Sequence, residues 1–315
     1  MTIAGVDKVR ERISVIMPCF NAETFVAEAV DSVLGQTYPN IELIVVDDGS
    51  TDGSREILAA YGDRITVIPQ SNSGPYHARN LGLRHASGAY VAFLDADDWW
   101  RRDFVETMHV ALETRPDCAL AYCGWQNVGA RDRSNEPFIP RDYETADKLE
   151  LMLGGGSPWP IHAALVRRAA IDAIGGFRED LATSLDFELW LRLCVGRRIV
   201  RVPEVLAFYR FHGEAQISAQ PWRQAINGWR IKRRFVDEHP EHVTTPGVDA
   251  ARRLADGVLL KRGYEFFWRR DLVSAQRIFR RSLFVGGWRP QDLRFLLPSL
   301  LPASVFRWLV VNRDA

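Results

Sequence analysis

The chain has 315 residues with 40 basic and 40 acidic side chains, so its formal net charge is zero. Apolar residues make up 47% and charged residues 25%, which is typical of a globular protein and excludes a disordered or fibrous chain. The four cysteines show no CxxC spacing, which excludes a zinc ribbon and gives no disulfide framework. The length exceeds one typical domain of roughly 100–200 residues and predicts a large domain with an appendage. We expect no nucleic-acid partner.

The charges are distributed unevenly along the chain. From Trp222 to the end there are 18 Lys or Arg against 9 Asp or Glu, whereas the remainder has 22 against 31. This division suggests that the C-terminal part meets an anionic surface, while the acidic part holds metal and nucleotide. Arginines on solvated helix faces are the alternative explanation.

The first half alternates short apolar runs with amphipathic stretches. Predicted strands cover residues 13–17, 41–46, 65–68, 89–94 and 120–124, and predicted helices cover 23–34, 50–61, 76–86 and 104–114. Pro18 is expected to end the first strand. Strands that alternate with helices predict an α/β fold with a doubly wound, mostly parallel sheet.

The second half is divided differently. Residues 126–143 are polar and predicted to be irregular, and residues 154–160 contain three glycines and two prolines, which predicts a mobile loop. Helices are expected over residues 220–238, 250–269 and 271–285. We therefore predict a ligand-binding domain over residues 1–219 and a helical, basic, Trp-rich region over residues 220–315.

The tail over residues 295–311 is apolar but contains Pro298, Pro302 and Arg307. It falls short of the roughly 20 clean residues needed to span a bilayer. It is expected either to lie on an anionic membrane or to pack against the first domain. The N-terminal residues lack the architecture of a secretory signal, which predicts a cytoplasmic protein, peripheral at the inner face of the cytoplasmic membrane if the tail binds there.

Three carboxylates follow the predicted strand at residues 89–94, in the sequence Asp95-Ala96-Asp97-Asp98. Open α/β sheets bind their ligands at the carboxyl ends of strands. Hard oxygen ligands suit Mg²⁺ or Mn²⁺, which keep waters and bind substrate phosphates. The alternative is a solvated acidic turn that caps the helix after Asp103.

Four polar motifs together resemble the family 2 glycosyltransferases of GT-A fold: Pro18-Cys-Phe-Asn21, the segment from Asp47 to Asp52, Ala78-Arg79-Asn80, and Asp95-Ala96-Asp97-Asp98. The likeness covers residues 13–218. It implies that the nucleotide sugar contacts Pro18, Phe20, Asn21, Glu23, Asp47, Asp48, Arg79, Asp95 and Ala96. It also implies that Asp97 is the chief ligand of Mn²⁺ or Mg²⁺, and that His212 binds the metal or a phosphate. For residues 48–52 a turn and helix cap is a compatible alternative.

The same resemblance implies that Asp186 is the catalytic base, since the family has an acidic pair before this helix. The pair reads Leu185-Asp186 here, so the first carboxylate is missing while the proton acceptor is kept. From the residues alone a helix cap is the favoured interpretation of Asp186, and Asp180 and Glu188 are weaker candidates for the base.

The resemblance predicts an inverting glycosyltransferase with a nucleotide-sugar donor, expected to carry UDP although GDP and dTDP stay open. The acceptor is expected to be a glycan or a lipid-linked glycan in surface polysaccharide synthesis. The alternative is a nucleotide-sugar-binding subunit without turnover, suggested by Leu185 and His77. Nucleotidyl transfer is disfavoured because no Gly-rich loop with a nearby lysine occurs near the N-terminus.

Overall fold

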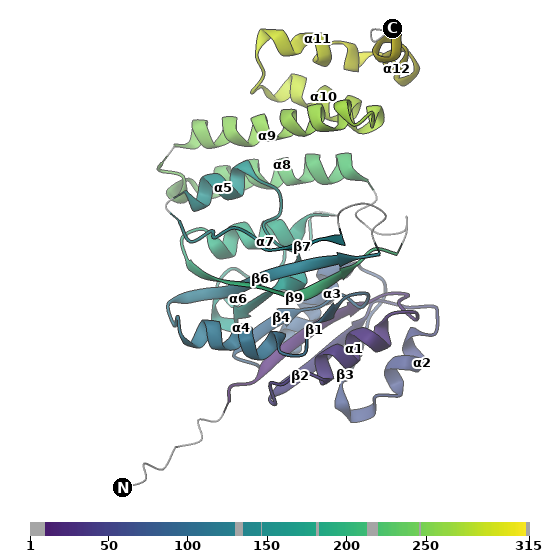
Figure 1. Ribbon diagram of the computed structural model, residues 1–315, viewed down its shortest axis with the longest axis vertical. Coiled ribbons are helices and arrows are strands. Elements are labelled where there is room, and N and C mark those ends of the chain that lie inside the picture. The colour runs from purple at the N-terminus through teal and green to yellow at the C-terminus, as the bar shows by residue number, and fades with distance from the viewer. Residues whose placement is uncertain are drawn as a thin grey trace. The chain divides into compact units, whose positions relative to one another are not determined.

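The computed structural model describes residues 10–129, 135–145, 147–180, 183–212, 220–245 and 247–312. Contacts within the chain form two compact units, whose elements are labelled in Figure 1. The first unit comprises Met1–Glu144, Trp159–Glu179 and Arg197–His212, and the second comprises Thr145–Pro158, Asp180–Gly196 and Gly213–Ala315. Two short stretches before residue 197 thus group with the C-terminal helices, and the domain boundary at residues 219 and 220 stays a prediction.

The first unit contains a nine-stranded sheet in the order β3-β2-β1-β4-β8-β6-β9-β5, with β7 paired to β6. The strands are β1 (Ile13–Cys19), β2 (Ile41–Asp47), β3 (Thr66–Pro69), β4 (Tyr90–Phe93), β5 (Trp99–Trp100), β6 (Cys118–Val128), β7 (Pro137–Phe138), β8 (Ala164–Arg167) and β9 (Arg198–Arg210). The two longest ladders, β1 with β2 and β6 with β9, are parallel, and β1 to β4 all run in one direction. The α/β fold with a mostly parallel sheet is therefore confirmed.

Strand β1 continues through Pro18, which was predicted to end it. The backbone amide of Leu94, just past the end of β4, donates to the Ile16 carbonyl at 3.1 Å, so this residue of β1 faces β4. Pro18 lies two residues further on and faces the same side, beyond the last paired residue of β4. The N–H that proline lacks is therefore not needed for pairing with β4.

Helices of the first unit are α1 (Val26–Leu34), α2 (Ser54–Ala59), α3 (Pro75–His85), α4 (Phe104–Glu113) and α6 (Arg168–Asp172). The first four are the helices expected from apolar spacing: α1 and α4 are slightly shorter than predicted, α2 is half as long, and α3 has the predicted length but begins one residue earlier. The expectation of an irregular segment over residues 126–143 was wrong in part, because β6 extends to Val128 and pairs with β7. The rings of Trp125 and Phe138 pack together across this pair, 4.6 Å apart.

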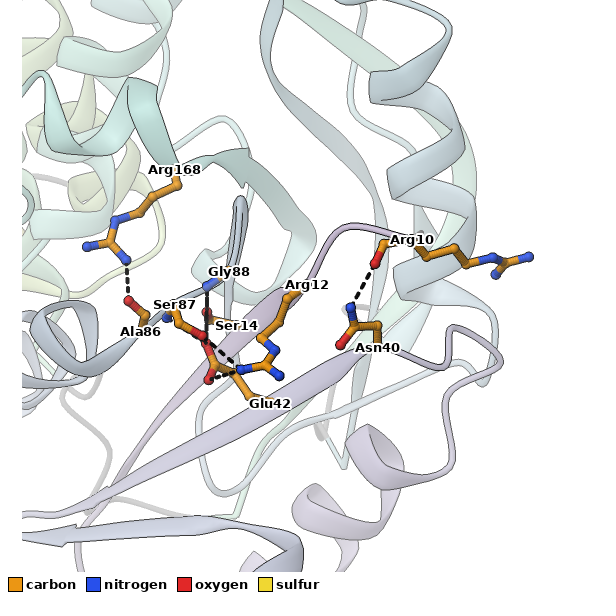
Figure 2. Close-up of polar contacts among 9 residues, drawn as sticks. All are labelled: Arg10, Arg12, Ser14, Asn40, Glu42, Ala86, Ser87, Gly88 and Arg168. Atoms are coloured by element: carbon orange, nitrogen blue, oxygen red, sulfur yellow. Dashed lines mark hydrogen bonds and ion pairs between the residues drawn. The ribbon is translucent and has the colours of Figure 1, made fainter. Parts of the chain in front are cut away.

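The amino edge of the sheet is fixed by the carboxylate of Glu42 on β2 (Figure 2). This carboxylate accepts hydrogen bonds from the Ser14 hydroxyl at 2.5 Å and from the amides of Ser87 and Gly88 at 2.6 and 3.1 Å. Burial alone would raise the pKa of Glu42, but these hydrogen bonds and the charge of Arg12 hold it below its ordinary value. One side chain thus joins β1, β2 and the turn that leads into β4.

The turn before β4 also requires a glycine. A Cβ atom at Gly88 would lie 2.7 Å from the Arg12 carbonyl oxygen and from the Ser14 amide and hydroxyl. The Gly88 amide donates to the Ser14 hydroxyl at 2.8 Å, a contact drawn in Figure 2. Only a residue without a side chain allows the backbone to approach β1 this closely.

The second unit is helical among its described residues. Its helices are α5 (Lys148–Gly154), α7 (Leu185–Cys194), α8 (Pro221–Glu238), α9 (Val248–Trp268), α10 (Leu272–Val285), α11 (Leu293–Leu296) and α12 (Ala303–Asn312). The three predicted helices of this region correspond to α8, α9 and α10, which pack side by side in Figure 1. The buried carboxylate of Asp256 joins α8 to α9, because it accepts hydrogen bonds from Trp229 at 2.7 Å and Arg233 at 2.9 Å.

The C-terminal tail forms α11, a 3-10 turn at Pro298–Leu300, and α12. Pro298 and Pro302 stand at the starts of the last two elements, since proline fits the first turn of a helix but not its interior. Leu296 and Phe306 are buried against α9 and α10. Within the described part of the chain, every helix falls short of the length and apolar content that crossing a bilayer requires.

Candidate active site

The predicted ligand-binding segments of the first unit lie at one edge of its sheet. β1, β2 and β4 are parallel neighbours, and their carboxyl ends lead into residues 18–23, 47–52 and 95–98. The chain order of the strands reverses between β1 and β4, and in open α/β sheets such a reversal opens a crevice for ligands. The structure therefore brings these three predicted segments to the position where this class of sheet binds nucleotides.

Asp48 holds the segment that leads into α3. Its Oδ1 accepts hydrogen bonds from the Gln70 side chain at 2.6 Å and the Ser73 amide at 2.8 Å, and its Oδ2 accepts one from the Gly74 amide at 2.8 Å. The side chain is buried. A carboxylate has about four acceptor positions, so one remains for a ligand.

Asp47 is buried beside it and orders the next loop. Its Oδ1 accepts from the Ser50 amide at 3.0 Å, and its Oδ2 accepts from Nε of Arg55 at 2.6 Å. The structure thus gives both carboxylates a part in holding the loops of the site. Their contact with a nucleoside stays a prediction.

The loop after β1 is bonded to the loop after β2. The Asn21 side chain accepts from the Thr51 amide at 2.8 Å, and the Glu23 carboxylate accepts from the Gly53 amide at 2.7 Å. Asn21 has a left-handed backbone with φ of 49°, which asparagine adopts more readily than most residues. Phe20 is half exposed at this edge, and its contact with a nucleotide stays a prediction.

Arg79 is buried on α3 and forms an ion pair with Asp95. Its guanidinium also lies over the rings of Tyr76 and Phe177, at 5.4 and 5.7 Å from their centroids. A charge buried this deeply needs a partner, and the Asp95 carboxylate supplies it. Arg79 therefore orients the first aspartate of the acidic loop; direct contact of Arg79 with a nucleotide stays a prediction.

Asp97 and His212 face one another. Oδ2 of Asp97 lies 2.8 Å from Nε2 of His212, and both side chains are partly exposed. His212 comes just after β9 and packs on Phe25, with ring centroids 4.8 Å apart. Mn²⁺ and Mg²⁺ can be bound by one carboxylate oxygen and one imidazole nitrogen while they keep several water ligands. These two residues therefore fit the predicted metal.

Beneath this pair, Asp98 and His162 form a buried ion pair. Oδ2 of Asp98 lies 2.9 Å from Nδ1 of His162, and both side chains are fully buried. Burial raises the pKa of Asp98 to about 6, against the opposing charge of His162. Burial also disfavours the His162 cation, but the attraction of Asp98 outweighs it and raises the pKa of His162. The opposite charge of each partner therefore offsets part of the cost of burying the other.

The end of β9 is held against the acidic loop by Arg210. Its amide donates to Oδ1 of Asp98 at 2.8 Å, and its Nε donates to the Asp97 carbonyl at 2.9 Å. The guanidinium lies over the rings of Trp99 and Phe25, 4.4 and 5.0 Å from their centroids. These contacts fix the backbone that carries His212 beside Asp97.

Sequence reasoning missed two of these residues, His162 and Arg210. His162 stands in a short 3-10 turn, Ile161–Ala163, outside every recognised motif. The only sequence signal for Arg210 is its position two residues before His212. Neither role is visible until the sheet pairs β8 with β4 and β9 with β5.

Asp186 belongs to the second unit, in the first turn of α7. Oδ2 of Asp186 lies 3.5 Å from the Ser157 hydroxyl. The weaker candidates for the base are engaged in salt bridges: Glu188 binds Arg192 at 2.6 Å, and Asp180 binds Arg234 at 2.6 Å. The role of Asp186 as the base stays a prediction.

Comparison with known sequences identifies the family signature. Residues 14–175 match the profile described as Glycosyl transferase family 2. TuaG of Bacillus subtilis (strain 168), named for teichuronic acid biosynthesis, is 35% identical over 234 residues, which cover 72% of this chain and 89% of the relative. A glycosyltransferase of Rickettsia prowazekii (strain Madrid E), RP339, is 31% identical over 68% of this chain and 67% of its own length.

Solved structures share the fold. S. aureus TarS 1–349 in complex with UDP superposes with a TM-score of 0.63 at 19% identity, covering 96% of this chain and 91% of that one. The mannosyltransferase PcManGT from Pyrobaculum calidifontis, in complex with GDP-Man and Mn²⁺, gives 0.60 at 20% identity and covers 96% and 84%. TarS 1–349 is also known in complex with UDP-GlcNAc, with a TM-score of 0.61.

Proposed function

The chain belongs to glycosyltransferase family 2, and from this premise we propose that it transfers a sugar, with inversion, from a UDP-linked donor to an acceptor hydroxyl. The observation that carries the proposal is the pairing of Asp97 with His212 at the carboxyl edge of β4. The complexes of TarS with UDP and with UDP-GlcNAc support the choice of UDP. The name of TuaG supports an acceptor in a cell-surface polymer, a glycan or a lipid-linked glycan.

In this proposal Asp97 and His212 hold Mn²⁺ or Mg²⁺, as the complex of PcManGT with GDP-Man and Mn²⁺ suggests. When bound there, the cation would offset the negative charge that develops on a departing nucleoside diphosphate. Asp95, oriented by Arg79, accepts a hydrogen bond from the donor ribose. The loops after β1 and β2, with Pro18, Phe20, Asn21, Glu23, Asp47 and Asp48, enclose the nucleoside, and the Ala96 backbone borders the diphosphate.

Asp186 is the proposed base. It takes the proton of the acceptor hydroxyl while that oxygen bonds to the anomeric carbon of the sugar and the bond to the nucleoside diphosphate breaks. A single displacement from the opposite face inverts the configuration at that carbon. A base of this kind contributes typically 10²–10⁴-fold to the rate.

Titration calorimetry with UDP, GDP and dTDP, each with and without Mn²⁺, tests the proposal. UDP is expected to bind at least about tenfold more tightly with Mn²⁺, a difference of about 1.4 kcal/mol. Slow hydrolysis of a matching nucleotide sugar is expected once the nucleotide is known. Binding without hydrolysis or transfer would favour a non-catalytic binding subunit, and absence of binding to all three nucleotides would refute the donor site.

We also propose that the C-terminal tail contacts an anionic membrane. Trp308 is 64% exposed, Leu297 52%, Leu300 49% and Val305 40%, a dense set of apolar side chains on a short segment. Residues 293–312 contain two arginines and no acidic residue. Exposed apolar side chains flanked by basic ones suit the boundary between lipid headgroups and acyl chains.

Vesicle sedimentation tests this contact. The protein is expected to sediment with phosphatidylglycerol-containing vesicles far more than with vesicles of phosphatidylcholine alone. The double variant Leu300→Asp, Trp308→Asp is expected to bind the phosphatidylglycerol-containing vesicles at least about tenfold more weakly. Val110→Asp is the matched control, because Val110 is 54% exposed on α4 of the other unit. Equal sedimentation of the double variant and the control would rule out the tail as the membrane contact.

A further inference from the structure

Lys232 on α8 is a buried cation whose role the proposed function does not explain. Its side chain is only 3% exposed, and its ammonium donates a hydrogen bond to the Gly155 carbonyl at 2.5 Å. Burial, with a smaller contribution from the charge of Arg262, lowers the pKa of Lys232 to about 7. Burying an amine costs free energy unless the amine forms a hydrogen bond. The bond to the Gly155 carbonyl therefore has to hold for Lys232 to stay buried.

The carbonyl that Lys232 binds lies in the glycine loop, which we define as Gly154–Ser157. This loop follows α5, and consecutive glycines lose more backbone freedom on ordering than other residues. The hydrogen bond from Lys232 to the middle of this loop therefore has a large effect on the position of the last residue of the loop. That last residue is Ser157, whose hydroxyl lies 3.5 Å from Oδ2 of Asp186.

Lys232 also lies close to the residue that follows Asp186 on α7. Its ammonium is 5.5 Å from the ring centroid of Phe187, the buried residue that follows Asp186 on α7. Ser184, two residues before Asp186, has a left-handed backbone with φ of 66°. The backbone at the start of α7 is thus constrained, and Phe187 in this turn packs near the Lys232 ammonium. The same ammonium holds the glycine loop.

We propose that Lys232 is a positioning residue for Asp186: it orders the glycine loop through the Gly155 carbonyl and thereby holds Ser157 against the carboxylate. This inference rests on the proposed role of Asp186 as the base. The hydroxyl of Ser157, 3.5 Å from Oδ2 of Asp186, restricts the rotamers of this carboxylate and so helps to hold it in one orientation. Misplacement of a reacting group by about 1 Å can cost as much as 10²-fold in rate.

Lys232→Met and Ser157→Ala test the chain of contacts. Methionine keeps the apolar stem of Lys232 but removes the donor, and Ser157 is exposed, so its truncation leaves the core intact. Each variant is expected to lower kcat roughly tenfold without changing the donor KM. The double variant is expected to be no slower than either single one, because both act on the same contact.

A second readout separates positioning from stability. Amide hydrogen exchange of residues 154–157 is expected to be faster in Lys232→Met and unchanged in Lys261→Met, a control that removes an exposed lysine of α9. Unchanged kcat in Ser157→Ala, multiplicative losses in the double variant, or unchanged loop exchange in Lys232→Met would each overturn the proposal.

The variant Asp186→Asn distinguishes the proposed role of Asp186 as the base from the proposed role of Lys232 as a positioning residue. If Asp186→Asn keeps wild-type turnover, the base assignment itself fails. If Asp186→Asn is slow while Lys232→Met and Ser157→Ala have wild-type kcat, the base assignment stands and only the positioning role fails.

Discussion

Asp97→Ala is expected to remove the effect of Mn²⁺ on nucleotide binding and to lower turnover by about 10³-fold. The physical reason is the loss of the one carboxylate that faces His212 at 2.8 Å, so that the cation loses its main ligand and the departing diphosphate loses its counter-charge. Calorimetry with the nucleotide, with and without Mn²⁺, measures the first effect, and a transfer or hydrolysis assay measures the second.

Two further variants make this experiment sharper. Asp97→Asn keeps the shape of the side chain but offers a neutral oxygen, so it is expected to bind Mn²⁺ weakly and to fall between the alanine variant and the wild type. Asp63→Ala, at an exposed position in the first unit, is the control and is expected to behave as the wild type. Wild-type dependence on Mn²⁺ in Asp97→Ala would show that the cation binds elsewhere.

Asp186→Asn is expected to lower kcat by ~10²–10⁴-fold while the donor affinity stays unchanged, because the amide cannot accept the proton of the acceptor hydroxyl. Steady-state kinetics with the acceptor, together with calorimetry of the nucleotide, separate these two effects. The pH dependence adds a third readout: the fall of kcat at acidic pH that a titrating base produces is expected to disappear in the variant.

Asp180→Asn provides the control for the second experiment. Its carboxylate binds Arg234 on α8, so its loss is expected to change stability slightly and kcat hardly at all. If instead Asp180→Asn were slow and Asp186→Asn fast, the base would have to be reassigned to Asp180.

Strands β1, β2 and β4 could be predicted because most of their residues are buried and they appear as apolar runs. Strand β9 could not, although it is the longest strand. It carries Arg198, Arg201 and Glu204 among its apolar residues, and its pairing with β6 is interrupted by register shifts. Its extended form comes from pairing with strands distant in sequence, which a local pattern does not reveal.

The site shows the same division. The acidic loop was predictable, since its residues are adjacent in sequence and follow an apolar strand. The partners that orient it were not: no local pattern pairs Arg79 on α3 with Asp95, although Arg79 is buried and forms an ion pair with that carboxylate. The buried pair of Asp98 and His162 joins segments that only the folded sheet brings together. The residues that were predicted to bind the ligand form short motifs, whereas the residues that support them are spread along the chain.

The Glu42 network on the amino edge has a consequence for protein engineering. It fixes the register of β1, β2 and the turn into β4 with one carboxylate, at the end of the strands opposite to the acidic loop. Segments on the carboxyl edge can therefore be exchanged with those of related transferases without removing the contacts that align the strands. A chimera that keeps Ser14, Glu42 and Gly88 retains its scaffold while its ligand preference is changed.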